Sequence, residues 1–250
     1  MIRFAALAMT ALTLLPAPAQ ALDLETMTDA ERTAFRAEVR AYLMENPEVI
    51  IEAVNVLEQR QAVADTAADQ AMVIQNKAEL FDDGFSWVGG NPDGDITLIE
   101  FMDYRCAYCR RAVPEVEKLL ASDGNIRLIV KELPILGDDS TLSSRFAVAT
   151  KMVAGSDAYK QVHDALMEYK GDVSDVALRR LADGLGLDTD AIMARMGDDD
   201  ITEELAQTRA LASRLSISGT PTFVLEDELL RGYLSADQMA ALVSQIRDAK

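Results

Sequence analysis

The chain has 250 residues, of which 49% are hydrophobic and 26% are charged, a composition typical of an ordinary folded protein. Its 42 acidic residues against 24 basic ones give a formal net charge of -18, which argues against nucleic acid or an anionic membrane as a partner. The length suits one domain with an appendage.

The first 21 residues have the features of a secretory signal peptide. Arg3 is followed by an apolar run to Leu15, and small residues at Ala19 and Ala21 form a typical cleavage site. The run is shorter than the about 20 apolar residues that span a bilayer. We therefore expect cleavage after Ala21 and a periplasmic mature protein, whose net charge is -19 because only Arg3 is lost.

Residues 22–80 predict a helical extension. Thr28 and Glu31 form a capping-box pattern at the start of one helix, and Asn46-Pro47 separates it from the next. Apolar residues at helical spacing follow each start: Phe35, Val39, Tyr42 and Leu43, then Ile50, Val54 and Leu57. Such a stripe packs either on the protein's own domain or on copies of itself, and we favour self-association into a homo-oligomer.

Residues 81–250 predict the main domain. Residues 85–88 indicate a first strand, and residues 91–94 indicate a turn into an apolar central strand over residues 96–102. A further buried strand is predicted over residues 126–130. A helix between these last two strands would make a parallel β-α-β unit, which places chemistry at the carboxyl end of the central strand.

The chain has two cysteines, Cys106 and Cys109, with Ala107 and Tyr108 between them. Cys106 lies four residues after the end of the predicted central strand. A cysteine at a helix N-terminus has its pKa lowered from about 8.5 to roughly 3.5–7.5, because the helix dipole favours the thiolate. The pair therefore predicts dithiol chemistry. Three nearby arginines are candidate cations for the thiolate or simply a solvated basic rim: Arg105, Arg110 and Arg111.

The cysteine pair has two other interpretations. A structural zinc site needs four ligands, and the only histidine is His163, so one chain cannot close it. A structural disulfide across two intervening residues would constrain the unfolded chain little. Redox activity is the preferred interpretation.

The rest of the domain predicts a helical insertion followed by a return to the sheet. Residues from about 140 to 214 have helical patterns, with starts near Ser174 and Asp188. Residues 219–225 then predict a strand, and a last helix is expected to begin at Ser235.

Three segments of the chain, in the order in which they occur, resemble the motifs of one protein family. They are Glu100-Phe101-Met102-Asp103-Tyr104-Arg105-Cys106-Ala107-Tyr108-Cys109, Lys131-Glu132-Leu133-Pro134-Ile135-Leu136-Gly137 and Gly219-Thr220-Pro221-Thr222-Phe223. The chain resembles the DsbA-like thiol:disulfide oxidoreductases, especially the exported subgroup with an N-terminal oligomerising helical extension (ScsC-like). The resemblance implies an α/β protein with a thioredoxin-like fold and a helical insertion, preceded by an all-α N-terminal extension.

The resemblance also implies roles for four residues. Cys106 matches the nucleophile that forms a mixed disulfide with a substrate, and Cys109 matches the thiol that resolves it. Pro221 matches the family's cis-proline beside the cysteines. Thr220, just before it, matches a position that tunes the reactivity of the sulfurs.

Glu100 is a lone acid in an apolar strand, six residues before Cys106. A buried carboxylate is costly unless it is paired or protonated, and Lys131, at the end of the next strand, is its expected partner. In the family, an acid at this position helps move the proton of Cys109. The alternative is a salt bridge without a kinetic role.

We expect an exported enzyme that exchanges disulfides with client proteins and is reset by a membrane redox partner, with no cofactor and no metal. The dipeptide between the cysteines lacks a histidine, which leaves oxidase and isomerase activity open. An alternative is a metal-binding or holdase module whose cysteines meet across an oligomer to hold copper or zinc.

Overall fold

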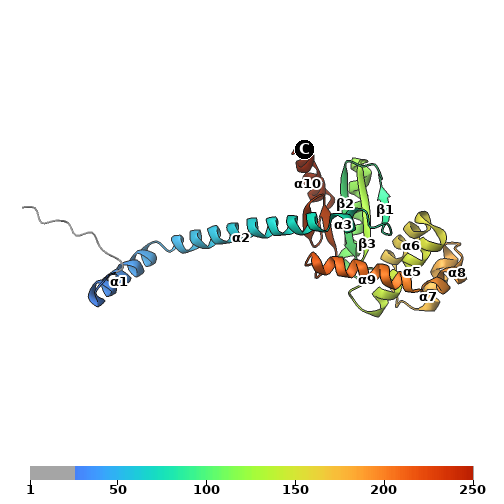
Figure 1. The fold of residues 1–250 in the computed structure, drawn as a ribbon, viewed down its shortest axis with the longest axis horizontal. Coiled ribbons are helices and arrows are strands. Elements are labelled where there is room, and N and C mark those ends of the chain that lie inside the picture. The colour runs from blue at the N-terminus through green and yellow to red at the C-terminus, as the bar shows by residue number, and fades with distance from the viewer. Residues whose placement is uncertain (1–25, 250) are drawn as a thin grey trace, which may run out of the picture. The chain divides into compact units, whose positions relative to one another are not determined.

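The computed structural model of the protein describes residues 26–249 (Figure 1). The predicted signal peptide, residues 1–21, lies outside the described residues. The chain divides into two units, with the boundary between Gln59 and Arg60. Within residues 26–249, no helix is both long enough and apolar enough to cross a membrane.

The first unit contains α1 (Asp29–Glu45) and the beginning of α2 (Glu48–Gln75). The predicted capping box is confirmed, because the Glu31 N–H donates to the Thr28 hydroxyl and the Thr28 N–H donates to the Glu31 carboxylate. The predicted break is confirmed as well, since Asn46 ends α1. No side chain of α1 is buried. The apolar stripe of this helix therefore faces solvent in the single chain.

The second unit is built on a five-stranded sheet with the strand order β1-β3-β2-β4-β5. The central strands β2 and β3 are parallel, and the other neighbours are antiparallel. The predicted β-α-β unit is thus confirmed. The strands are β1 (Trp87–Gly90), β2 (Ile96–Met102), β3 (Ile126–Glu132), β4 (Thr222–Leu225) and β5 (Glu228–Arg231).

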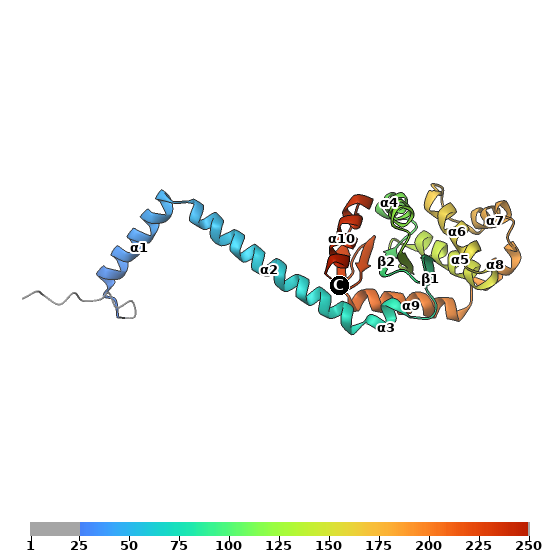
Figure 2. The same ribbon diagram turned by 90° about the horizontal axis from the view of Figure 1, so that it is seen from above.

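Helices cover both faces of this sheet. Figure 2 shows α4 and α10 on one face and α3 and α9 on the other. Five helices between β3 and β4 form the predicted insertion. The helices of the unit after α2 are α3 (Lys77–Phe81), α4 (Ala107–Asp123), α5 (Asp138–Ala154), α6 (Ser156–Glu168), α7 (Asp175–Gly184), α8 (Thr189–Arg195), α9 (Asp199–Arg214) and α10 (Ala236–Asp248).

The alternation of side chains along β2 and β3 creates two hydrophobic cores. Leu98 on β2 and the aligned Leu128 on β3 face α4, whereas Ile99 faces α3 and α9. Val73, near the end of α2, and Leu80, in α3, are buried in the second of these cores. The last part of the predicted extension, residues 22–80, therefore belongs to the second unit, because the first unit ends at Gln59.

Side-chain caps confirm three of the predicted helix starts. Ser174 accepts a hydrogen bond at the start of α7, Asp188 does so at the start of α8, and Ser235 forms a capping box at the start of α10. Gly124 ends α4 in the left-handed conformation, with φ of 71°. This sharp ending lets the chain enter β3 two residues later.

Candidate active site

The cysteine pair lies at the carboxyl end of β2. That strand ends at Met102, and Cys106 is the N-cap residue of α4, as the sequence predicts. The two sulfurs are free thiols and differ in accessibility, since Cys106 is 7% exposed and Cys109 is fully buried. Tyr108, between them, is 57% exposed. Only the first sulfur can therefore meet a large substrate.

The two thiols also differ in acidity. Hydrogen bonding from Cys109 lowers the pKa of Cys106 to about 5, with further contributions from Thr220 and from the backbone N–H groups of Cys109 and Tyr108, although burial opposes them. The same hydrogen bond with Cys106 raises the pKa of Cys109, and burial and the Glu100 charge raise it further. At neutral pH the site therefore holds one thiolate and one thiol.

Thr220, the residue directly before Pro221, contacts the first cysteine. The Thr220–Pro221 peptide bond is cis, as the resemblance implies. In its protonated form, the Cys106 thiol donates a hydrogen bond to the Thr220 carbonyl oxygen over 3.1 Å. The structure therefore brings together four of the six residues singled out in the sequence, from the start of α4 and from the segment before β4.

The three arginines near the motif have different partners. Arg105 donates to the Gly171 carbonyl over 2.9 Å, and Arg111 lies over the ring of Tyr233. Arg110 donates to the carbonyl of Tyr104, in the turn before Cys106. Burial lowers the pKa of Arg110, and the Cys106 charge acts in the opposite direction. Arg110 thus lies close enough to Cys106 for the two charges to interact.

Asp103 was not singled out in the sequence, yet its carboxylate organises the loops around the site. It is fully buried, and its Oδ1 accepts from the Arg105 N–H over 2.8 Å. Its Oδ2 accepts from the N–H groups of Ile135 and Leu136 over 2.8 and 3.1 Å. The carboxylate therefore joins the turn before Cys106 to the loop after β3. The signal that could have revealed it is an aspartate at a strand end directly before the cysteines.

Glu100 lies beneath the site as a buried acid. It is 3% exposed, and its Oε1 has no hydrogen-bond partner among the described residues. Burial raises its pKa to about 8, and the Cys106 charge adds to this effect. At neutral pH the carboxyl is therefore mainly protonated and can give or take a proton.

The expected pairing of Glu100 with Lys131 is wrong. Glu100 is aligned with Val130 on β3, so the next residue, Lys131, points to the opposite face of the sheet. There Lys131 is 1% exposed and its Nζ donates to the Asp83 carboxylate and to the Glu79 carbonyl. Burial lowers the pKa of Lys131, and the ion pair with Asp83 opposes this. Lys131 thus holds the segment before β1 against the sheet.

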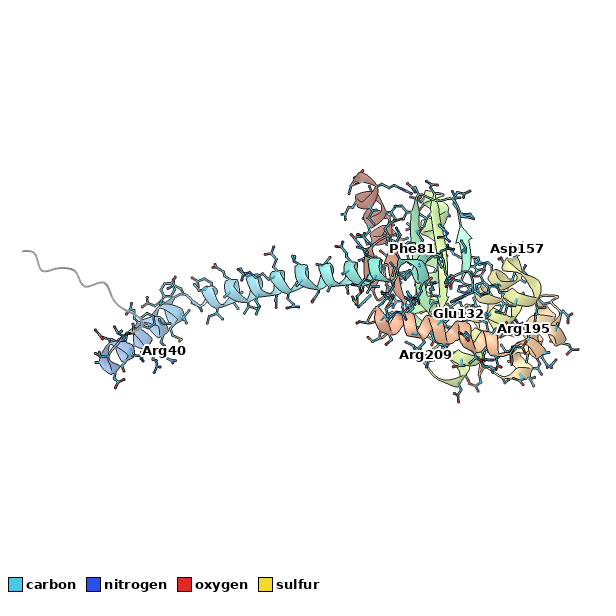
Figure 3. All side chains as sticks on the ribbon, viewed as in Figure 1. Arg40, Phe81, Glu132, Asp157, Arg195 and Arg209 are labelled. Carbon is cyan, nitrogen blue, oxygen red and sulfur yellow. The ribbon has the colours of Figure 1, made fainter. Side chains whose placement is uncertain are left out.

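A second buried acid, Glu132, is labelled in Figure 3 and lies at the end of β3, where it joins the sheet to the helical insertion. Its carboxylate accepts hydrogen bonds from Tyr104 over 2.7 Å, from Tyr159 over 2.6 Å and from Ser144 over 2.7 Å. Burial raises its pKa to about 7, and these three hydrogen bonds oppose the rise. The Nδ1 atom of His163 lies 3.2 Å from the Tyr104 hydroxyl oxygen.

These features define an α/β protein of thioredoxin-like fold, with an asymmetric dithiol at the carboxyl edge of its sheet. Among residues 26–249, no three His, Cys, Asp or Glu side chains are grouped so that they would hold a metal ion. The two thiols and the buried Glu100 carboxyl support thiol–disulfide exchange and proton transfer.

Comparison with known proteins gives the family. Residues 97–247 match the DSBA-like thioredoxin domain, and residues 31–64 match the copper resistance protein ScsC N-terminal domain. The chain belongs to the family of proteins with a DSBA-like thioredoxin domain. The expected fold and family are thereby confirmed.

Solved structures agree with this membership. A thioredoxin-like oxidoreductase from Silicibacter pomeroyi DSS-3 is 40% identical, with a TM-score of 0.66, over 70% of this chain and 99% of that chain. A linker-deletion mutant of Proteus mirabilis ScsC is 25% identical, with a TM-score of 0.66, over 91% of this chain and all of that chain.

A curated relative is much longer than this protein. The Na(+)/H(+) antiporter NhaA 3 of Salinispora tropica is 30% identical over 156 residues, which are 62% of this chain and 24% of the antiporter. The chain thus spans about a quarter of the length of the curated relatives it matches first.

Proposed function

We propose that the protein is an exported thiol:disulfide oxidoreductase that acts on protein disulfides through Cys106 and Cys109. The observation that carries this proposal is the asymmetry of the pair: Cys106 is 7% exposed and has a pKa lowered to about 5, whereas Cys109 is fully buried and has a raised pKa. A nucleophile for disulfide exchange needs thiolate character and access, and a resolving thiol needs neither until the first bond has formed.

The reaction proceeds in two exchanges. The Cys106 thiolate attacks a client disulfide, forms a mixed disulfide and releases one client sulfur as a thiolate. Cys109 then loses its proton and attacks the Cys106 sulfur, which releases the second client sulfur and leaves a Cys106–Cys109 disulfide. Run in reverse, the same steps oxidise a client dithiol. The direction depends on the partner that resets the pair, and we propose a membrane redox partner for this task.

Glu100 is the proposed proton carrier for the buried sulfur. Cys109 must lose a proton when it attacks and must regain one when it leaves. The Glu100 carboxyl lies close enough for its charge to raise the pKa of Cys109, and its own pKa of about 8 lets it exist in both forms near neutral pH. Lys131 has no place in this relay, since it lies on the other face of the sheet.

We propose that the site accepts extended segments of client proteins that contain cysteines. Exposed apolar side chains flank Cys106, with Tyr108 at 57%, Ile135 at 38% and Leu136 at 54% exposure. The last two belong to the loop that Asp103 ties to the cysteine turn. An unfolded chain supplies apolar side chains for such a surface, whereas a folded client buries them.

We further propose that the first unit joins copies of the chain. Phe35, Val39 and Tyr42 are 44%, 41% and 54% exposed and recur at helical spacing on α1. The match of residues 31–64 to the ScsC N-terminal domain supports a separate role for this segment. An oligomer would present several thiolates to one misfolded client, which favours repeated exchange and thus isomerase activity.

The deciding experiment is reactivation of scrambled ribonuclease by the reduced protein without its signal segment. We expect recovery with the wild type, loss with Cys106→Ser, and accumulation of mixed disulfides with Cys109→Ser, because only the first thiol attacks and only the second resolves. Trapping by Cys106→Ser instead would reverse the assignment. Inert thiols together with near-stoichiometric copper or zinc in the purified protein would overturn the proposed function.

The role of the first unit is tested with a matched pair of variants. Val39→Glu places a charge in the apolar stripe of α1, whereas Ala41→Glu places it two residues on, nearly on the opposite side of the helix. We expect Val39→Glu to dissociate the oligomer in sedimentation velocity and to lower ribonuclease reactivation, and Ala41→Glu to do neither. A wild-type protein that sediments as a 27 kDa monomer or smaller would contradict self-association.

A further inference from the structure

Arg111 is an exposed arginine of α4 that contacts two tyrosine rings beside the cysteine pair. Its guanidinium carbon is 5.6 Å from the centre of the Tyr108 ring and 5.0 Å from the centre of the Tyr233 ring. Tyr108 is one of the two residues between the cysteines, and Tyr233 belongs to the turn between β5 and α10. Each ring attracts the cation, so the two contacts restrict where the guanidinium lies.

Tyr233 is itself tied to α4 and to the cis-proline segment. Its hydroxyl donates to the Glu115 carboxylate over 3.1 Å, and the first N–H of α10 donates to the same carboxylate over 2.8 Å. The N–H of Gly232, the preceding residue, donates to the Pro221 carbonyl over 3.0 Å. Figure 2 shows α10 next to α4. The aromatic contacts therefore place Arg111 at the rim of the site, on the side of the turn after β5.

The guanidinium of Arg111 has no acceptor oxygen among residues 26–249. By contrast, Arg105 forms an ion pair over 3.7 Å, and Arg110 donates to a backbone carbonyl. Glu115, one helical turn further along α4, accepts hydrogen bonds from the turn after β5 and from α10 instead. The ring contacts use the charge of the guanidinium and leave its N–H donors able to bind an acceptor oxygen.

A carboxylate is the ligand that fits this group. The guanidinium is planar, and its N–H donors match the two oxygens of a carboxylate in a bidentate pair. The net charge of -18 repels acidic segments at long range, but the screening length at physiological ionic strength is about 8 Å. At contact distance, the charge of Arg111 therefore decides which client side chain is favoured.

The spacing along α4 gives the position of this carboxylate in the client. Arg111 follows Cys106, the N-cap residue, by five residues, which is about 7.5 Å along a helix axis. Two residues of an extended chain span nearly the same length, about 7 Å, and side chains two residues apart point to the same side. A side chain two residues from the client cysteine therefore reaches Arg111 when that cysteine meets Cys106.

We propose that Arg111 binds an aspartate or glutamate of the client, two residues from the cysteine whose disulfide is exchanged. The preferred substrates are then disulfides in extended segments that carry an acidic side chain at this position. Tyr233 is a positioning residue, because it acts through the guanidinium. This specificity rests on the proposed function, since it names the class of client for the same dithiol.

Activated peptides measure this preference. They are alanine-based 2-pyridyl disulfides of a central cysteine, with Glu, Gln or Lys at both positions two residues from it. The Cys106 thiolate attacks the peptide sulfur, forms the mixed disulfide and releases 2-thiopyridone, whose absorbance gives the rate. At pH 7 and 0.15 M salt we expect the Glu peptide to react about two- to fivefold faster than the Gln peptide, as for an exposed ion pair, and the Lys peptide to react more slowly than both. Glu at the two adjacent positions should give no such advantage, since those side chains point away.

Three variants assign the preference, each scored by the ratio of the Glu and Gln rates, because this ratio cancels any change in the thiolate itself. Arg111→Gln should make the two rates equal, and Arg111→Lys should keep part of the difference, since lysine retains the charge without the planar fork. Arg179→Gln removes the same charge from α7, where Arg179 pairs with Asp190, and should keep the wild-type ratio.

The positioning role of Tyr233 is tested in the same assay. Tyr233→Ala removes the ring that contacts the guanidinium and should lower the ratio, whereas Tyr233→Phe keeps the ring and should retain most of it. Circular dichroism spectra that match the wild type show that both variants are folded.

Equal rates for the Glu and Gln peptides with the wild type, or a preference for Glu that survives Arg111→Gln, would overturn the carboxylate site. Ribonuclease reactivation by the wild type separates this failure from failure of the proposed function. Reactivation together with equal peptide rates would remove the specificity and leave the proposed function intact. The expected peptide preference without reactivation would overturn the proposed function and retain the carboxylate site.

Discussion

The sulfur of Cys106 lies 3.1 Å from the carbonyl oxygen of Thr220, although 114 residues separate the two in the chain. The contact joins the start of α4 to the segment that leads into β4, the strand next to β2. A reactive sulfur and an edge of backbone thus face the same point at the surface. This is the geometry that an extended client needs, because its backbone can pair with one segment while its disulfide meets the other.

The acidity of Cys106 gives the first prediction. Alkylation of the reduced protein by iodoacetamide should follow the thiolate fraction, with a midpoint near pH 5. Since the hydrogen bond from Cys109 is the largest cause, Cys109→Ala should move the midpoint upward. Mass spectrometry of the labelled protein measures both. A midpoint at the ordinary thiol value of about 8.5 in the wild type would contradict the assignment of the nucleophile.

The second prediction concerns Glu100 and stability. Its pKa rises from the ordinary value of 4.5 to about 8 on folding, so the penalty for its burial is absent below pH 4.5, grows through this range and is complete above pH 8. Glu100→Gln should therefore leave the free energy of unfolding unchanged at pH 4 and raise it by about 2–4 kcal/mol at pH 9.

Urea unfolding of the reduced protein at the two pH values tests this. Glu132→Gln is the comparison variant. Burial also raises the pKa of Glu132, to about 7, but the substitution replaces one of the two oxygens that accept its three hydrogen bonds, so its gain at pH 9 should be smaller than that of Glu100→Gln. A gain of stability by Glu100→Gln that is equal at pH 4 and pH 9 would show that the carboxyl is not the titrating group.

The sequence was sufficient to predict the strands, the cysteine pair at the start of α4 and the caps of several helices, because each depends on local patterns. It was not sufficient for the pairing of Glu100. Both Glu100 and Lys131 stand out as charged residues in apolar strands, but whether they meet depends on the register of β2 and β3, and a shift of one residue exchanges the two faces. Asp103 and Glu132 were missed for a similar reason, since four of their six hydrogen bonds described above join segments 27 to 33 residues apart.

The third prediction tests the position of Lys131. Lys131→Met leaves the Asp83 carboxylate nearly buried and unpaired, which should lower the free energy of unfolding by about 3–5 kcal/mol. Adding Asp83→Asn should recover part of this loss. The rate of disulfide exchange, measured at a temperature where both variants are folded, should stay at the wild-type value, because the pair lies on the face of the sheet away from the cysteines. A rate loss as large as that of Glu100→Gln would place Lys131 in the proton relay.

The fourth prediction concerns Asp103, whose carboxylate accepts three backbone N–H groups around the site. Hydrogen bonds to a charged group contribute about 1.5–3 kcal/mol each, so Asp103→Ala should lower the free energy of unfolding by roughly 3–5 kcal/mol once partial hydration of the freed N–H groups is allowed for. Asp103→Asn keeps one acceptor oxygen and should lose about half as much.

The local consequence of the Asp103 substitutions is the sharper test. Hydrogen exchange of the Ile135 and Leu136 amides should accelerate in Asp103→Ala by a larger factor than exchange of the β2 and β3 amides, because these two N–H groups lose their acceptor whereas the strand ladder keeps its own. Reduction of client disulfides should slow in parallel, since the apolar loop beside Cys106 is no longer fixed. Unchanged protection of both amides would mean that the loop is held by its own packing and that Asp103 does not position the client surface.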